Sequence, residues 1–235
     1  MIKFFREIRH KLFIENKFSK YLTYATGEIL LLVIGILIAL QLNNWNEQRK
    51  NVNAEKQYYK NIKRQLQEDI NVIKRNIEFN QRYYNQYQYA IQLISDNDRS
   101  NLDSLAKISI NILEFSDFHQ ETNIYQTLVN SGEIKLLNNQ NIIEGLQRLE
   151  ETYIYINRVE VSHFDVIKFI YSELPKIVRF KPIKIEKVDR FFEFEFQNHF
   201  VTVSDIMMEK DEVYKQALYE INLIIDMINV ELNTD

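Results

Sequence analysis

Glu160 and His163 have the residue types and the spacing of a metal-ligand pair. Residues three apart share one face of a helix, and Glu-x-x-His pairs ligate iron in di-iron helix bundles. Such a site also needs a second pair and further carboxylates on neighbouring helices, and the other apolar stripes of this sequence contain no second pair. The competing interpretation is a buried polar contact that fixes the register of packed helices. We therefore expect no bound metal, no other cofactor and no catalytic residue.

Composition narrows the classes of function further. The chain has no Cys, so a thiolate nucleophile, a disulfide and a Cys-ligated metal are excluded. Its four Gly leave little material for a phosphate-binding loop. The net charge is −4, and the residues after position 45 carry 23 basic and 30 acidic side chains. A mildly acidic body disfavours nucleic acid as a partner.

An apolar stretch near the N-terminus predicts a transmembrane helix over residues 21–42. Every residue from Ile29 to Leu40 is apolar or Gly. A helix of this predicted length rises by about 33 Å, against a hydrocarbon core of about 30 Å. Tyr21 and Tyr24 at one end and Trp45 at the other match interfacial aromatic residues. A cleaved signal peptide and a buried core helix are the alternatives.

Basic residues are concentrated before the predicted span. Residues 1–20 contain six Lys and Arg, against three in the 15 residues after Leu42. Positively charged flanks tend to stay in the cytoplasm. We therefore expect a cytoplasmic tail at 1–20, a single pass through the lipid bilayer, and an exported domain at 43–235.

One face of the predicted span combines Glu28, Gly35 and Ala39, which are spaced seven and four residues apart. An ionisable group inside a membrane is costly, and small residues let two helix backbones approach. We interpret this face as a candidate contact between membrane helices. The alternative is that Glu28 reaches headgroup water at the cytoplasmic interface and that the small residues recur by chance.

Two segments carry a distinctive pattern. The first joins Lys17-Phe18-Ser19-Lys20-Tyr21 and Gly27-Glu28-Ile29 to an apolar span and then to Asn43-Asn44-Trp45-Asn46-Glu47. The second contains Tyr125-Gln126-Thr127-Leu128-Val129-Asn130-Ser131-Gly132 and Leu136-Leu137-Asn138-Asn139. Together they resemble a family of uncharacterised bacterial single-pass membrane proteins with a domain of unknown function. The resemblance implies the inner membrane of a Gram-negative cell, with residues 43–235 in the periplasm, and it implies no catalytic residue.

The rest of the sequence predicts an all-α domain. One helical stripe of apolar residues continues from Trp45 to Ile94, so that the transmembrane helix runs on into a long helix. A second stripe, from Ile142 to Leu174, repeats in heptads and includes Glu160 and His163. A third runs from Tyr214 to Leu232. Three long stripes and two short helices predict an antiparallel helical bundle.

Local signals predict where elements begin and end. Ser100-x-x-Asp103 and Asn141-x-x-Glu144 fit helix N-terminal caps, and Asp96-Asn97-Asp98 and Gly132 fit helix stops. Between residues 178 and 196 apolar and polar residues alternate, including Phe192, Phe194 and Phe196. This spacing favours either a short β-hairpin at 178–196 or an irregular connector.

Three functions fit these observations, and we expect the first. It is a membrane-anchored helical interaction or scaffold protein without catalysis, forming a homo-oligomer or binding another membrane protein through its long helices and the Glu28 face. The second is a periplasmic ligand-binding sensor module that works through a membrane partner. The third is a metal-dependent enzyme that uses Glu160 and His163.

Overall fold

The structure, a computed structural model, describes residues 18–118 and 124–233, and it confirms the predicted all-α class. Most of the basic tail and the side chains of Tyr21 and Tyr24 lie outside the described residues. The α-helices are α2 (Phe18–Ser95), α3 (Leu102–Asn111), α4 (Ile124–Ser131), α5 (Gln140–Glu173), α6 (Val188–Phe191) and α7 (Phe194–Asn233). Two 3₁₀ helices, η1 (Glu133–Leu136) and η2 (Leu174–Lys176), and strands β1 (Val178–Phe180) and β2 (Ile183–Ile185) complete the described elements.

The chain divides into an N-terminal unit, residues 1–54, and a bundle unit, residues 55–235. Among the described residues one helix, α2, is long and apolar enough to cross a membrane. None of its apolar window is buried inside the chain. Leu31 is 63% exposed and Trp45 is 61% exposed. Within the part of the chain that the structure describes, these apolar side chains are therefore not packed into a core.

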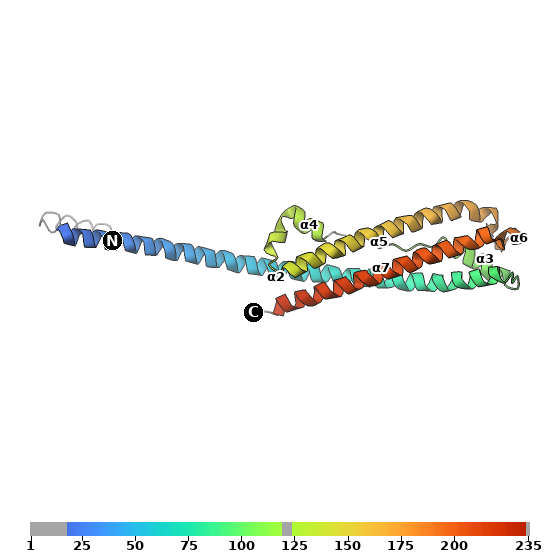
Figure 1. Cartoon of the computed structure of the whole chain (residues 1–235), viewed down its shortest axis with the longest axis horizontal. Coiled ribbons are helices and arrows are strands. Elements are labelled where there is room, and N and C mark those ends of the chain that lie inside the picture. The colour runs from blue at the N-terminus through green and yellow to red at the C-terminus, as the bar shows by residue number, and fades with distance from the viewer. Residues whose placement is uncertain (1–17, 119–123, 234–235) are drawn as a thin grey trace. The chain divides into compact units, whose positions relative to one another are not determined.

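The bundle unit is built from three long helical segments, which Figure 1 shows running alongside one another: α2 from residue 55 onward, α5 and α7. Hydrogen bonds of Thr152 to Glu220 and of Tyr214 to Glu160 show that α7 runs antiparallel to α5. α5 itself runs parallel to α2. The segment that follows α3 brings the chain back to the end of the bundle where α5 starts. Its direction is shown by two contacts, because Phe115 lies against His163 and Phe118 lies against the earlier residue Tyr153.

The stops of α2 and α4 follow the predicted signals. Asn97 adopts a left-handed φ of 48°, and the backbone N–H of Asp98 donates to the carbonyl of Leu93 at 2.8 Å. This six-to-one hydrogen bond closes a helix in the manner of a Schellman motif. α4 ends at Ser131, and Gly132 follows with φ 73°. A residue without a Cβ adopts that conformation at little steric cost.

Both predicted N-terminal caps are wrong by one or two residues. The N-cap of α3 is Asn101, whose side chain makes no capping hydrogen bond, and the helix ends at Asn111. The N-cap of α5 is Asn139, whose side chain accepts from the backbone N–H groups of Asn141 and Ile142 at 3.0 and 3.3 Å. The sequence pattern favours Asn141 over Asn139, because Asn141 is followed by a Glu three positions later.

The neighbouring Asn138 holds the start of the bundle unit. Its backbone N–H and its side-chain amide both donate to the carboxylate of Glu55, at 2.7 Å each. The hydroxyl of Tyr59 donates to the same carboxylate at 2.9 Å. The amide of Asn139 reaches Glu231 on α7 at 2.6 Å. The Asn-Asn pair thus connects three helices around the first turn of the bundle unit.

The hairpin is shorter than the predicted range 178–196 and covers residues 178–185. β1 and β2 pair antiparallel, with Val178 opposite Ile185. The alternating Phe residues that follow are not extended, because α6 begins at Val188 and α7 at Phe194. Phe194 is 70% exposed, whereas Phe191, Phe196 and Phe200 are buried against one another. Helical packing of these three rings overrides the alternation in the sequence.

The predicted heptad stripe of α5 is buried along its whole length, inside this chain. Its ten members are all buried: Ile142, Leu146, Leu149, Tyr153, Ile156, Glu160, His163, Ile167, Ile170 and Leu174. The apolar side chains of the bundle fall into two clusters, one around Leu66, Leu146 and Ile221 and one around Tyr87, Ile170 and Phe200. On each long helix, polar residues occupy the positions between the two clusters.

Candidate functional site

A polar layer separates the two apolar clusters of the bundle unit. We define it by five buried residues: Asn76 and Asn80 of α2, Glu160 and His163 of α5, and Lys210 of α7. Each belongs to the buried face of its helix, so the layer spans all three long segments. Both residues of the predicted Glu-x-x-His pair are members, and the structure adds three partners from outside α5.

Glu160 is the hydrogen-bond acceptor at the centre of this layer. Its Oε1 accepts from the backbone N–H of Phe118 at 2.7 Å and from the hydroxyl of Tyr214. Asn76 donates to the same tyrosine oxygen at 3.4 Å and to the carbonyl of Asp117 at 2.8 Å. Burial raises the pKa of Glu160, and these hydrogen bonds with the charge of Lys210 oppose that rise.

Lys210 is almost completely buried, at 1% exposure. Its Nζ donates to the carbonyl of Ser116 at 2.5 Å and lies 4.9 Å from the centre of the Phe115 ring. Burial lowers the pKa of Lys210 to about 8, although the carboxylate of Glu160 favours its charged form. A cation held by a carbonyl, an aromatic face and a nearby carboxylate has the partners that a buried charge needs.

His163 differs from the other members, because neither of its ring nitrogens has a hydrogen-bond partner among the residues that the structure describes. The ring is fully buried and packs 5.3 Å from the centre of Phe115. Burial first, and the charge of Lys210 second, lower the pKa of His163 to about 3. The imidazole is therefore neutral at physiological pH and packs as an aromatic side chain.

This geometry gives the metal-ligand interpretation of Glu160 and His163 little support. Within the described residues, no group of three or more His, Asp or Glu side chains is arranged around a common point that would suit a metal ion. The positive charge of Lys210 acts on both Glu160 and His163. A second cation at the same place would meet that charge in a medium of low dielectric constant. Apart from His163, each member of the layer is hydrogen-bonded to a group on another element.

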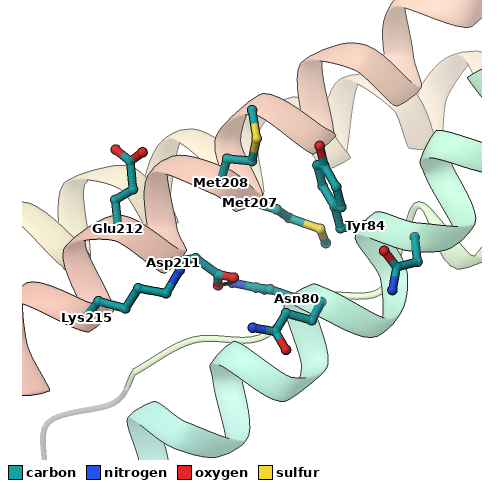
Figure 2. A pocket seen from close by; sticks show the side chains of 9 residues that line it. Asn80, Tyr84, Met207, Met208, Asp211, Glu212 and Lys215 are labelled. Carbon is teal, nitrogen blue, oxygen red and sulfur yellow. Dashed lines mark hydrogen bonds between the residues drawn. The ribbon is translucent and has the colours of Figure 1, made fainter.

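A groove between α2 and α7 adjoins the polar layer (Figure 2). Its volume is about 430 Å³, and its lining includes Asn80 and Tyr84 of α2 and Met207, Asp211 and Lys215 of α7. The amide of Asn80 donates to Asp211 at 2.8 Å, the bond that crosses the groove in the figure. Burial raises the pKa of Asp211, while the hydrogen bond from Asn80 and the charge of Lys215 oppose the rise.

The predicted contact face of the apolar stretch lies in the N-terminal unit. Gly35 and Ala39 are exposed, and Glu28 is half-buried. Among the described residues, nothing lies within 4 Å of a Cβ added at Gly35. The face is therefore open at Gly35 within this part of the chain.

Lys210, Asn76 and Asn80 were not predicted from the sequence, although a signal for each is present. The buried stripe of α7 extends upstream of Tyr214 through Phe200, Val203, Met207 and Lys210 in steps of three and four residues. Asn76 and Asn80 follow Ile73 with the same spacing. A charged or amide residue in a heptad position is the pattern to look for.

A family model described as "Family of unknown function (DUF6090)" matches residues 28–205, about three quarters of the chain. The match includes most of the apolar stretch and the hairpin. It also includes four of the five residues of the polar layer, and Lys210 lies beyond it. No curated protein and no solved structure matches the chain.

Proposed function

The chain belongs to the family of unknown function DUF6090, and we propose that it is a membrane-anchored, non-catalytic helical protein that acts by binding other proteins. The observation that carries this proposal is the exposure of the apolar residues of the N-terminal unit. Twelve successive residues, 29–40, are apolar or Gly, and every one of them is exposed. A contiguous apolar surface of this kind marks a membrane or protein contact.

A lipid bilayer is the environment that fits this surface best. All backbone hydrogen bonds of a helix are internal, which is what a hydrocarbon environment requires. A core helix of a soluble protein would be buried by its own chain, whereas the described residues bury none of the apolar window here. The excess of Lys and Arg before the stretch supports a cytoplasmic N-terminus and an exported bundle unit.

The arrangement of the bundle unit supports binding in preference to catalysis. The carboxylate of Glu160 and the ammonium of Lys210 are occupied by hydrogen bonds to groups of the chain itself. The heptad stripe of α5 is also used within the chain, so it is not available to a second copy. Association through helices then falls to the exposed residues, with the Glu28, Gly35 and Ala39 face as the candidate in the membrane.

Cell fractionation tests the anchor. The full-length chain should sediment with membranes and be released by detergent but not by high salt. Reporter fusions at the two termini should place the N-terminus in the cytoplasm and the C-terminus on the far side. Recovery of the intact chain in the soluble fraction without detergent contradicts the proposal.

Cysteine cross-linking tests the contact face, because the natural chain has no Cys. Oxidation in membranes should cross-link Ala39→Cys into dimers, or to a partner, more strongly than Leu37→Cys, which lies on the opposite side of a helix. Gly35→Leu, added to Ala39→Cys, should weaken the cross-link, because a bulky side chain separates the backbones. Equal cross-linking at positions 37 and 39 excludes this face.

A further inference from the structure

We propose that the groove between α2 and α7 is a binding site for a small zwitterion of the α-amino acid type with an apolar side chain. This activity goes beyond the proposed anchoring and protein-binding function and does not depend on it. All residues that carry it belong to the bundle unit.

The size of the groove selects a small ligand. Binding pockets have volumes of roughly 300–1,000 Å³, and this groove, at about 430 Å³, lies near the lower limit. Its walls come from two helices that are fixed against each other by the bundle, with the bond from Asn80 to Asp211 between them. A free amino acid fits such a space, whereas a long peptide does not.

Charges of both signs line the groove on one side of α7. Asp211 and Lys215 are four residues apart and therefore share a helix face. Figure 2 shows the side chain of Lys215 extended towards Asp211. A simple cation would be attracted by Asp211 and Glu212 but would meet the charge of Lys215, and a simple anion would be attracted by Lys215 but would meet the two carboxylates. A molecule that carries an ammonium and a carboxylate complements both charges at once.

Asp211 is held in place for this role by buried groups. Asn80 is only 1% exposed; its Nδ2 donates to Asp211, while its Oδ1 accepts from the hydroxyl of Ser116 at 3.3 Å. The amide therefore has a fixed orientation, and the carboxylate that it orients is half-buried. A ligand ammonium would bind a carboxylate whose conformational freedom is already lost, which lowers the cost of association.

Apolar side chains line the part of the groove beside these charges. Met207 is buried at 1% exposure, and Figure 2 shows it directed from α7 towards Tyr84 on α2. Met208 lies at the rim and is 46% exposed. Methionine adapts to irregular apolar shapes, and the Tyr ring adds a flat face. A ligand side chain of the size of Leu, Met or Phe would bury the exposed parts of Met208 and Tyr84. A second carboxylate, Glu212, lines the same groove.

Isothermal titration calorimetry on the detergent-solubilised full-length chain tests the proposal. The probes are L-leucine, L-methionine and L-phenylalanine, together with L-leucine amide, which lacks the carboxylate, and N-acetyl-L-leucine, which lacks the ammonium. At least one free amino acid should bind, and each derivative of leucine should bind at least ten-fold more weakly than the parent. No binding by any of the three amino acids, or equal binding of a derivative, overturns the proposal.

Two variants assign the charges. Asp211→Asn should weaken binding of the free amino acid at least ten-fold. Lys215→Met should remove the preference for leucine over leucine amide. Asp165→Asn and Lys168→Met, which break an exposed ion pair of 2.7 Å on α5, are matched controls and should leave binding unchanged. Unchanged binding in Asp211→Asn, with an unchanged circular dichroism spectrum, overturns the proposal. Failure of the membrane anchor would show in fractionation and would leave this titration unaffected.

Discussion

Tyr214 on α7 donates the hydrogen of its hydroxyl group to the carboxylate of Glu160 on α5, 54 residues earlier in the chain. Both side chains are buried, and the same carboxylate oxygen accepts from the backbone of Phe118. One acceptor therefore joins two long helices and the segment that returns along α5. A one-turn slip of either helix would separate the pair, so the contact specifies the register of the bundle.

Removing the hydroxyl group should destabilise the bundle. Tyr214→Phe leaves a buried carboxylate with one of its donors missing, and we expect a loss of about 1–3 kcal/mol in the free energy of unfolding. Urea unfolding of wild type and variant measures it. Tyr219→Phe is the control, because Tyr219 is 66% exposed and should change stability by less than about 0.5 kcal/mol. Equal effects of the two substitutions contradict the role assigned to Tyr214.

The pH dependence of stability should contain a contribution from His163. Its pKa is about 3 in the folded chain and about 6.5 when unfolded, so the unfolded chain binds more protons between these values. Stability is therefore lost as the pH falls through 6.5. From pH 7.5 to pH 5.5 this one group accounts for a loss of about 1 kcal/mol.

His163→Phe isolates that contribution. Neither ring nitrogen has a partner to lose, and an apolar ring suits the contact with Phe115. The variant should be at least as stable as wild type at pH 7.5 and should lack the acid-dependent loss, while Glu160 and other groups titrate in both proteins. Stability curves that run parallel between pH 7.5 and 5.5 would refute the assignment. His199→Phe, at a half-buried position, should change the dependence of stability on pH less than His163→Phe does.

The capping role of Asn139 separates it from Asn141. Asn139→Ala removes the acceptor for two backbone N–H groups and the contact with Glu231, and we expect a loss of about 0.5–2 kcal/mol. Asn141→Ala changes an exposed side chain and should cost less than about 0.5 kcal/mol. Thermal unfolding of the two variants measures the difference. A larger loss of stability in Asn141→Ala than in Asn139→Ala would show that Asn141 is the N-cap, as the sequence pattern indicated.

The close crossing of α5 and α7 at Gly145 predicts a steric effect. A Cβ at this position would lie 3.0 Å from Cγ1 of Ile224, which is buried. Gly145→Val should destabilise the bundle by about 1–3 kcal/mol through overpacking. In the double variant with Ile224→Ala, the losses should be less than additive, because the smaller side chain makes room for the new one. Strict additivity in a double-mutant cycle would show that the two positions do not interact.

The elements that sequence analysis predicted well are those with long-range periodicity. The heptads identify the buried face of α5, a helix of 34 residues. A periodic pattern of this length fits a helix and no other secondary structure. Stops at Asp96–Asp98 and Gly132 depend on local backbone conformation, which the sequence encodes directly. The beginning of α7 was missed because three Phe residues alternate locally, and only tertiary packing of Phe191, Phe196 and Phe200 decides between helix and strand.

The polar layer was half predicted. Glu160 and His163 stand out as polar residues in an apolar stripe, and both are buried. The hydrogen bonds of Glu160 across elements fit the register interpretation, whereas His163 adds no polar contact to it. The sequence does not predict which residues lie next to Glu160 and His163. Lys210, Asn76 and the backbone of Phe118 come from elements distant in the chain. Spacing identifies which face of a helix is buried, but it does not specify which residue of another helix lies opposite.

The positions of the aromatic residues make the two units separately observable. The chain has a single Trp, and it is the exposed Trp45 of the N-terminal unit, whereas Tyr59, Tyr87 and Tyr214 are buried in the bundle unit. Indole emission can be excited at wavelengths where phenol hardly absorbs. The emission maximum of Trp45 therefore reports whether water or an apolar environment, such as detergent or lipid, surrounds the end of the apolar stretch. The near-ultraviolet circular dichroism signal is dominated by the packed tyrosines. One sample in one cuvette can thus reveal insertion and folding as two signals.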